Sequence, residues 1–139
     1  MRKLIAAAVA AAVIVSAVPA NAAGPSGAYK GKIKYQGYDI SFNVKNGKVS
    51  KIVANLLQDC DGDGSSETMT LAPKGSFKLK NGRVHATPSD RYDSSVAHYD
   101  FDIELKGSGA KGYIREWDSV DGAGVVCDTL KRDFTAKRS

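Results

Sequence analysis

The 139-residue sequence has few of the residues that usually carry catalysis or bind cofactors. It contains two cysteines, two histidines and one tryptophan. The cysteines are far apart in the chain, which excludes a Cys-x-x-Cys redox motif. Neither His85 nor His98 belongs to a His-x-x-x-His pair, and no Gly-x-Ser-x-Gly nucleophile motif is present. We therefore predict no catalytic residues, and we expect both histidines to lie on the surface of a sheet.

The sequence also has only one long apolar run. It covers residues 4–18, follows Arg2 and Lys3, and precedes Pro19 and a small-residue triplet over 20–22. This order is typical of a secretory signal peptide, and the run is shorter than the roughly 20 residues of a membrane-spanning helix. We predict a secreted, extracellular protein without a transmembrane segment. The expected organisation is a signal peptide over 1–22, a flexible leader over 23–28 and a single β domain over 29–139.

The excess of basic residues is too small to indicate nucleic-acid binding. The chain has 20 Lys and Arg against 15 Asp and Glu, a net charge of +5. Loss of Arg2 and Lys3 with the signal peptide would lower this charge to +3, because that segment contains no acid. The lysines fall at alternating strand positions and beside turns, and no aromatic residues are interleaved with a basic cluster. We expect solvated sheet faces and no nucleic-acid partner.

No stretch of a dozen residues after residue 22 shows the apolar spacing of three and four that is typical of a helix. Apolar and polar residues alternate instead, most clearly over 97–106. Asn46-Gly47 and Asn81-Gly82 are typical two-residue turns of tight hairpins. We predict an all-β fold with one disulfide, either a single antiparallel β-sandwich or a partly open β-barrel, of about eight or nine short strands.

The expected strands cover 29–35, 40–45, 48–57, 68–71, 77–79, 84–86, 97–106, 110–117 and 125–134, and the expected loops cover 88–95 and 118–124. In the third strand the apolar positions change parity between Val49 and Ile52. This change predicts a β-bulge or burial on both faces. A continuous last strand would place Leu130 and Phe134 on the same face.

Cys60 and Cys127 can form a single intramolecular disulfide, and export into an oxidising compartment would allow it to form. The bond would join the end of the third expected strand to the beginning of the last one. It would close a long loop, to which the chain-entropy model assigns about 4 kcal/mol of stabilisation. We predict this disulfide as the main covalent constraint of the domain.

The segment after the third strand carries alternating acids. Asp59, Asp61 and Asp63 match the acidic positions at the start of an EF-hand calcium loop, and Glu67 stands at its ninth position. The twelfth position, where a bidentate Glu is expected, is Thr70. Two interpretations stay open: a weak calcium site of Asp59, Asp61, Asp63 and Glu67, the only cofactor considered, or an exposed turn whose side chains bind their own backbone.

Two further groups of side chains are candidates for function. One is an aromatic binding surface near turns and strand ends: Tyr35, Tyr38, Tyr92 and Trp117. The other is a row of acids on one face of the strand over 97–106, namely Asp100, Asp102 and Glu104, which together with His98 would suit a small hydrolase. Strand alternation alone also explains this row, because the three acids are the polar side of the strand. Basic residues across the sheet would then neutralise them.

Several short motifs together carry a resemblance to a known group of proteins. They are Gly27-x-Tyr29-x-Gly31, Ile40-Ser-Phe-x-Val44 followed by Asn46-Gly47-Lys48-Val49, and Cys127-Asp-Thr near the end of the chain. In this combination the sequence resembles a loose group of small exported bacterial β-rich proteins, common in actinobacteria, which have two cysteines and mostly no assigned activity. The resemblance implies the fold and the disulfide but no catalytic residue.

We therefore expect a secreted, non-enzymatic β domain that acts as an extracellular or cell-surface binding module. Its partner would be an extracellular or cell-wall component that the sequence does not identify, and the oligomeric state is also open. A small secreted hydrolase and a secreted inhibitor are the alternatives. A pocket that gathers the acids of the strand over 97–106 with His98 would favour the hydrolase, whereas a convex, lysine-covered sheet would favour binding.

Overall fold

The computed structural model describes residues 25–60, 62, 64 and 66–139. The signal peptide predicted over 1–22 lies outside these residues. In the leader expected over 23–28, the first strand already begins at Gly27, and the Tyr29 hydroxyl donates a hydrogen bond to the Pro25 carbonyl at 3.1 Å. The first strand therefore starts two residues before the predicted strand over 29–35.

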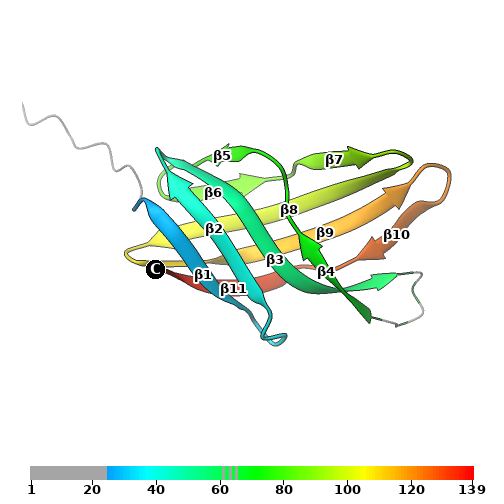
Figure 1. Ribbon diagram of the computed structural model, residues 1–139, viewed down its shortest axis with the longest axis horizontal. Coiled ribbons are helices and arrows are strands. Elements are labelled where there is room, and N and C mark those ends of the chain that lie inside the picture. Colours follow the sequence, from blue (N-terminus) through cyan, green and yellow to red (C-terminus); the bar gives the residue numbers. More distant parts are fainter. Residues whose placement is uncertain (1–24, 61, 63, 65) are drawn as a thin grey trace, which may run out of the picture.

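The described residues form strands and no helix, as the apolar alternation predicts, and so no helix among them is long enough to cross a membrane. Eleven antiparallel strands belong to one sheet (Figure 1). They are β1 (Gly27–Ile33), β2 (Asp39–Lys45), β3 (Lys48–Cys60), β4 (Ser66–Leu71), β5 (Ser76–Lys78), β6 (Arg83–Ala86), β7 (Ser89–Tyr92), β8 (Ser95–Lys106), β9 (Gly109–Val120), β10 (Gly124–Asp128) and β11 (Arg132–Arg138).

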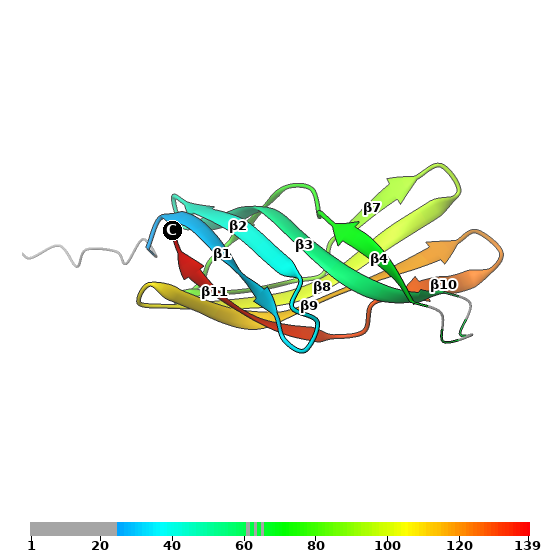
Figure 2. The ribbon, with the colours of Figure 1, turned by 60° about the horizontal axis from the view of Figure 1, so that its bottom comes forward.

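The sheet folds over on itself into two facing layers. The strand order is β10-β3-β2-β1-β11-β9-β8-β6, with β4 and β5 paired to β3 and with β7 paired to β8. Figures 1 and 2 show β1, β2 and β3 crossing over the long β8–β9 hairpin, and the pairing of β1 with β11 joins the two layers. The prediction of an all-β fold of antiparallel strands is confirmed, although with more strands than expected.

Aromatic and aliphatic side chains from both layers fill the space between them. Tyr29 stacks on Phe42 at 5.1 Å between ring centroids, and Phe42 meets the edge of Phe134 at 6.2 Å. Phe77 from β5 packs edge-on against Phe101 of β8 at 4.9 Å. The odd-numbered residues of β8 from Ala97 to Leu105 are all buried, so the clearest alternation in the sequence identifies the core face correctly.

A β-bulge in β3 explains the parity change in its apolar residues. The register between β2 and β3 shifts between Ser41 and Asn43 of β2. Lys51 is exposed, with a φ of 51° in the left-handed region, as expected for the extra residue of a bulge. Val49 before it and Ile52 after it consequently both point into the core, with exposures of 0% and 1%.

Several expected loops and strands differ from the structure. The segment 88–95, expected to be a loop, contains β7, a polar edge strand that gains its backbone hydrogen bonds from β8. The loop expected over 118–124 is shorter, because β9 extends to Val120 and a tight turn follows. The expected tight turn at Asn81-Gly82 forms, with Lys80 bridged to Arg83 across it. However, β5 pairs with β3 and β6 pairs with β8, so the turn joins strands of different layers.

The single strand expected over 125–134 is divided into β10 and β11. Between them, Leu130 has a φ of 57° and is 55% exposed, whereas Phe134 is buried. The prediction that these two residues lie on the same face is therefore wrong. The left-handed backbone at Leu130 interrupts the alternation and lets the chain continue along β9 in a new register.

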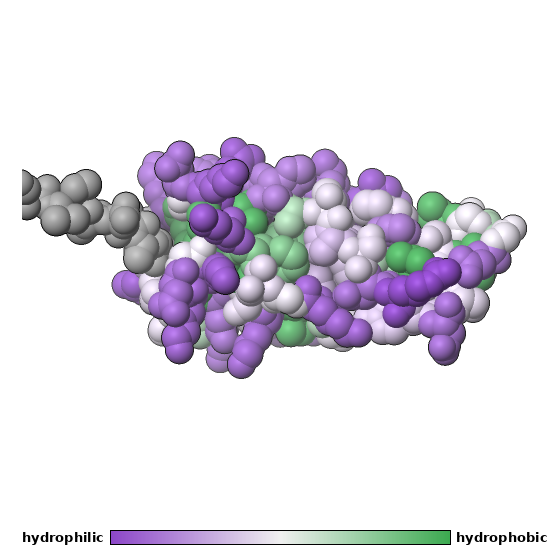
Figure 3. Space-filling view, turned by 90° about the horizontal axis from the view of Figure 1, so that it is seen from above, coloured by the Kyte–Doolittle hydropathy of each residue, from purple (hydrophilic) through white to green (hydrophobic). Residues whose placement is uncertain are grey.

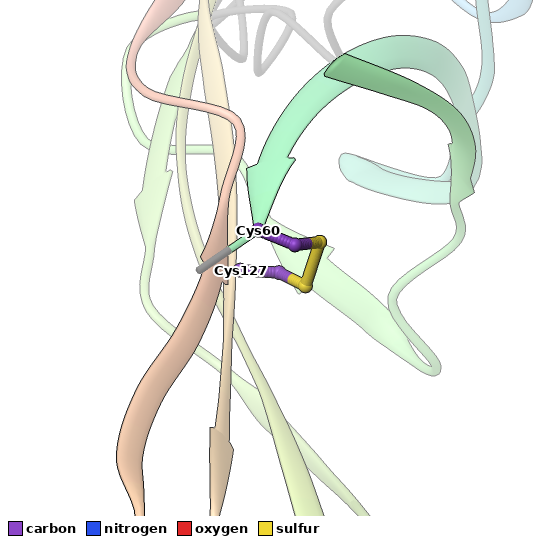
Figure 4. Close-up of a disulfide and its surroundings, with 2 residues drawn as sticks. All are labelled: Cys60 and Cys127. Atoms are coloured by element: carbon purple, nitrogen blue, oxygen red, sulfur yellow. A yellow bond between two sulfur atoms is a disulfide. The ribbon is translucent and has the colours of Figure 1, made fainter. Parts of the chain in front are cut away.

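The predicted disulfide is confirmed. Cys60, the last residue of β3, and Cys127 of β10 occupy directly opposite positions of paired strands, with their Cα atoms 4.0 Å apart (Figure 4). β10 also pairs with β9. The bond therefore connects the layer of β3 to the layer of β9 at the end of the molecule that the β1–β11 pairing does not reach.

Candidate functional site

The two layers diverge at the end of the molecule that holds β7 and β10. Figure 2 shows the β7–β8 and β9–β10 hairpins extending beyond β3 and β4, and Figure 3 shows apolar surface exposed among hydrophilic residues at this end. A cleft of about 470 Å³ lies on the inner face here. Its lining residues are Thr70, Ala72, Tyr92, Ser95, Ala97, Tyr99, Glu116, Asp118, Val120 and Val126.

Strand alternation along β9 brings two acids into this cleft. Ile114 is fully buried on the core face, and Glu116 and Asp118 follow at intervals of two, so they face the same side. Glu116 is only 6% exposed. Its Oε2 atom has no hydrogen-bond partner among the residues that the structure describes. Glu116 is therefore a buried acid of the cleft lining, and one of its carboxyl oxygens is closed to solvent and unsatisfied among the described residues.

The backbone at Glu116 is firmly held even though its carboxyl is not. Its amide donates to the Thr129 hydroxyl at 2.9 Å, and the Thr129 amide donates to the Glu116 carbonyl at 2.9 Å. Thr129 is itself 1% exposed. The connection between β10 and β11 thus fixes β9 from its edge, and the side chain of Glu116 is held toward the cleft.

Burial raises the pKa of the Glu116 carboxyl to about 8, and the nearby acids Asp118 and Asp90 add to this rise. Burial also raises the pKa of Asp118, with His98 on the other face of the sheet opposing the rise. The pKa of the Tyr99 hydroxyl is raised by burial first and by Glu116 next. At neutral pH the carboxyl of Glu116 is therefore mostly protonated in the unliganded cleft.

The mouth of the cleft is formed where the connection after β4 meets β7. The Lys74 amide donates to Asp90 Oδ2 at 3.2 Å, and Lys74 Nζ lies 5.0 Å from the centroid of the Tyr92 ring. Tyr92 is 46% exposed and lines the cleft. The volume of the cleft lies in the range of about 300–1,000 Å³ that is typical of small-ligand sites, and its lining combines alanines and valines with two acids and four hydroxyls.

The four residues predicted to form an aromatic binding surface do not lie together. Tyr35 is fully exposed in the turn between β1 and β2, whereas Tyr38 packs against the core. Tyr92 lines the cleft on the inner face. Trp117 lies on the outer face of β9, opposite His98, so the alternation of strand side chains separates it from Tyr92.

The Trp117 ring is engaged within the outer face itself. It stacks on His98 with 5.3 Å between ring centroids, and the Arg115 guanidinium lies 4.8 Å from its centroid. Arg115 in turn donates from Nε to Asp128 Oδ1 at 3.0 Å. These contacts make Trp117 part of a polar network that covers the sheet.

The row of acids on β8 is neutralised by residues across the sheet, as the alternation interpretation predicts. Asp100 accepts hydrogen bonds from His85 Nε2 at 2.9 Å and from the Tyr113 hydroxyl at 3.1 Å. The other ion pairs of the row are Lys131–Asp100 at 3.6 Å, Arg83–Asp102 at 2.9 Å and Lys111–Glu104 at 3.6 Å.

His98 does not take part in this row. Its two ring nitrogens are hydrogen-bonded to the hydroxyls of Ser89, at 3.0 Å, and Ser119, at 2.9 Å. The structure therefore does not bring His98 together with Asp100, Asp102 and Glu104 as a hydrolase site would require. Both histidines lie on the sheet surface, as expected.

The predicted calcium loop is only partly described, because Asp61 and Asp63 lie outside the described residues. Asp59 is opposite Ser66 and Glu67 is opposite Gln58 in the β3–β4 pair, so Asp59 and Glu67 project to opposite faces. Among the residues placed by the structure, no group of three or more His, Cys, Asp or Glu could hold a metal ion. Calcium binding stays a prediction.

The residues that best define a site, Glu116, Asp118 and Tyr99, were not among the candidates drawn from the sequence. One signal could have found them. Ala110 and Ile114 set the core parity of β9, and extending that parity places Glu116 inside and Trp117 outside. Core positions are usually apolar and solvent positions usually polar, and this part of β9 reverses both. Such a local violation of the pattern indicates a functional site.

Comparisons with protein-family models, with curated proteins and with solved structures found no match for this chain.

Proposed function

We propose that the protein is a secreted binding module, without catalytic activity, that takes a ligand group into the cleft between its diverging layers. One observation carries the proposal: Glu116 is buried at the cleft wall with an unpartnered Oε2 among the described residues. An unsatisfied buried acid costs free energy, so a native protein is expected to have a reason for it. A ligand that supplies the missing partner is such a reason.

Three features support an extracellular setting for this module. Residues 1–22 have the order of a signal peptide. The Cys60–Cys127 disulfide fits an oxidising compartment. The short motifs resemble those of small exported bacterial proteins. The ligand is accordingly expected outside the cell or at the cell wall.

A specific observation favours one alternative, a small hydrolase. Because the pKa of Glu116 is raised to about 8, this carboxyl keeps a proton at neutral pH, as a general acid must. Asp118 lies two residues further along the same face of β9. These two acids, rather than the neutralised row on β8, would form the pair. Product formation from chromogenic glycosides or esters that Glu116→Gln abolishes would establish this alternative.

The proposal is tested by mapping ligand binding with NMR. Purified ¹⁵N-labelled protein is titrated with a fragment collection that contains cationic, neutral and anionic members. We expect chemical-shift changes to concentrate on cleft residues such as Tyr92, Tyr99 and Val126. If no fragment shifts these resonances, or if the shifts concentrate on the outer face around Trp117, the cleft is not the binding site.

A further inference from the structure

The polar groups of the cleft share one chemical character. Two are acids, Glu116 and Asp118, and the others are the hydroxyls of Thr70, Tyr92, Ser95 and Tyr99. No lysine, arginine or histidine is among the described residues that line it. Asp90, on the inner face of β7, adds a third acid close enough to influence Glu116. The lining therefore offers acid groups and hydroxyls without a basic side chain, while the ammonium of Lys74 lies at the mouth on the Tyr92 ring.

From this geometry we infer that the cleft binds an organic cation, an ammonium or guanidinium group carried on an apolar chain, with Glu116 as its counter-ion. The inference rests on the proposed function and names the ligand class of the same site. The Glu116 carboxylate, whose Oε2 is closed to solvent and unpartnered among the described residues, would turn toward the cation and accept its hydrogen bond, and a charged donor makes such a bond stronger than a neutral one.

The walls fit the remainder of such a ligand. Ala72, Ala97, Val120 and Val126 provide apolar surface for a methylene chain. The rings of Tyr92 and Tyr99 also line the cleft, and aromatic faces attract ammonium and guanidinium groups. The Lys74 ammonium already lies 5.0 Å from the centroid of the Tyr92 ring, a cation–π contact of the kind that the ligand would make.

A divalent metal ion fits the cleft less well. Calcium takes six to eight oxygen ligands, usually from several carboxylates. Within the part of the chain that the structure describes, no group of three or more potential ligands is close enough together. Glu116 and Asp118 are also neighbours along a single strand, which separates their carboxyls, whereas an ammonium group with three donors can bridge to one acid and to hydroxyls.

Protonation provides the sharpest test of the inference. The titratable groups that face Glu116 are Asp118 on β9, Tyr99 on β8, and Asp90 and Tyr92 on β7, while β4 and β10 contribute Thr70 and Val126, which do not titrate. A bound cation favours the ionised carboxylate, so binding must release the proton of Glu116. A neutral or anionic ligand that accepts a hydrogen bond from protonated Glu116 would instead bind more weakly as the pH rises.

The experiment is calorimetric titration with pentylamine, and with pentanol as the neutral isostere, in buffers of different ionisation enthalpy. With a Glu116 pKa of about 8, we expect release of about 0.9 protons per amine bound at pH 7 and an affinity that rises roughly fifty-fold from pH 6 to pH 8. Pentanol should bind at least roughly tenfold more weakly than pentylamine.

N-acetyl-lysine amide and a lysine-containing peptide form a second arm, and whichever binds more tightly identifies the source of the ammonium group.

Two variants with the same chemical change separate the cleft from the outer face. Glu116→Gln should lower the affinity for pentylamine at pH 8 by roughly tenfold or more and should abolish proton release. Glu104→Gln, on the outer face of β8 beside Lys111, should change neither. Asp118→Asn, expected to cause a smaller loss, serves if Glu116→Gln does not fold.

The outcomes distinguish failure of the inference from failure of the proposed function. Equal affinities for pentylamine and pentanol, an affinity that falls with rising pH, or unchanged amine binding by Glu116→Gln would each overturn the cationic ligand class. If the NMR titration still maps neutral or anionic fragments to the cleft, the binding module stands with another ligand class. If no fragment reaches the cleft, both are wrong.

Discussion

At the scale of single residues, Glu116 should make the protein less stable as the pH rises. Its carboxyl has a pKa of about 8 in the folded protein against an ordinary value of 4.5. Between these values the unfolded chain loses a proton that the folded protein keeps, so the free energy of unfolding decreases with pH, by about 3 kcal/mol at pH 7. Glu116→Gln should remove this decrease, which urea denaturation at pH 5, 6, 7 and 8 would measure.

The matched control for this prediction is Glu104→Gln, which makes the same change at a position 42% exposed. Its stability should follow that of the wild type across the pH range within about 0.5 kcal/mol. If the wild type and Glu116→Gln give parallel curves between pH 5 and pH 8, then Glu116 is ionised in the folded protein and its burial is compensated by a partner.

Asp128 should have the opposite effect on the acid side. Burial alone would raise the pKa of Asp128, but the Arg115 guanidinium and the Leu130 amide outweigh it and hold the pKa below its ordinary value. The stabilisation is therefore present above the unfolded pKa near 4 and is lost as the pH falls through the lower folded pKa. Asp128→Asn should cost about 1 to 2 kcal/mol at pH 7 and much less at pH 2, as circular dichroism melts would show.

At the scale of elements, the β8–β9 hairpin depends on a close backbone approach. A Cβ atom at Gly112 would lie 1.8 Å from the Asp102 carbonyl oxygen, whereas one at Gly109 of the same strand would lie 3.5 Å from its nearest neighbour. Gly112→Ala should therefore force the two strands apart and destabilise the protein by roughly 3 kcal/mol or more. Gly109→Ala is the control and should cost less than about 1 kcal/mol. Urea denaturation measures both variants, and equal midpoints would contradict the close approach of the strands at Gly112.

Elements with strong local patterns could be predicted from the sequence. The alternation of β8 and the parity change at Lys51 both have a local cause, either regular pleating or one extra residue. β7 could not be predicted in this way, because Ser89–Tyr92 has no apolar alternation and exists through its pairing with β8. The division at Leu130 escaped prediction for the same reason, since it depends on how β10 and β11 meet β9.

The candidate site was less predictable than the fold, because burial of an acid is a property of its surroundings. Glu116 is buried by residues from β4, β7, β8 and β10, which are distant in the sequence. The acidic loop, by contrast, is conspicuous in the sequence, yet Asp59 and Glu67 face opposite sides of the β3–β4 pair. Local composition indicates where acids are concentrated, whereas tertiary packing determines which acid is buried with a raised pKa.

At the scale of the whole molecule, the two ends of the sandwich are held by different means. One end is joined by the continuous pairing of β1 with β11, over five residue pairs, and by the stacked aromatic core. At the other end the described residues of β3 and β10 form two pairs, Cys60 with Cys127 and Asp59 with Asp128. The disulfide is thus the principal link between the layers beside the cleft, and Val126 of the cleft wall is its immediate neighbour.

Removal of the disulfide should therefore have a global and a local effect. The double variant Cys60→Ala, Cys127→Ala should lower the free energy of unfolding by about 4 kcal/mol, the chain-entropy value for a sequence separation of 67. Hydrogen exchange should also show that amides of β10 lose protection by local opening before the amides of the central β8 strand do. Loss of the two-pair contact between β3 and β10 would widen the cleft end, while the β1–β11 end stays paired. If β10 and β8 lose protection equally, the molecule opens only as a whole and the disulfide has no special role in shaping the cleft.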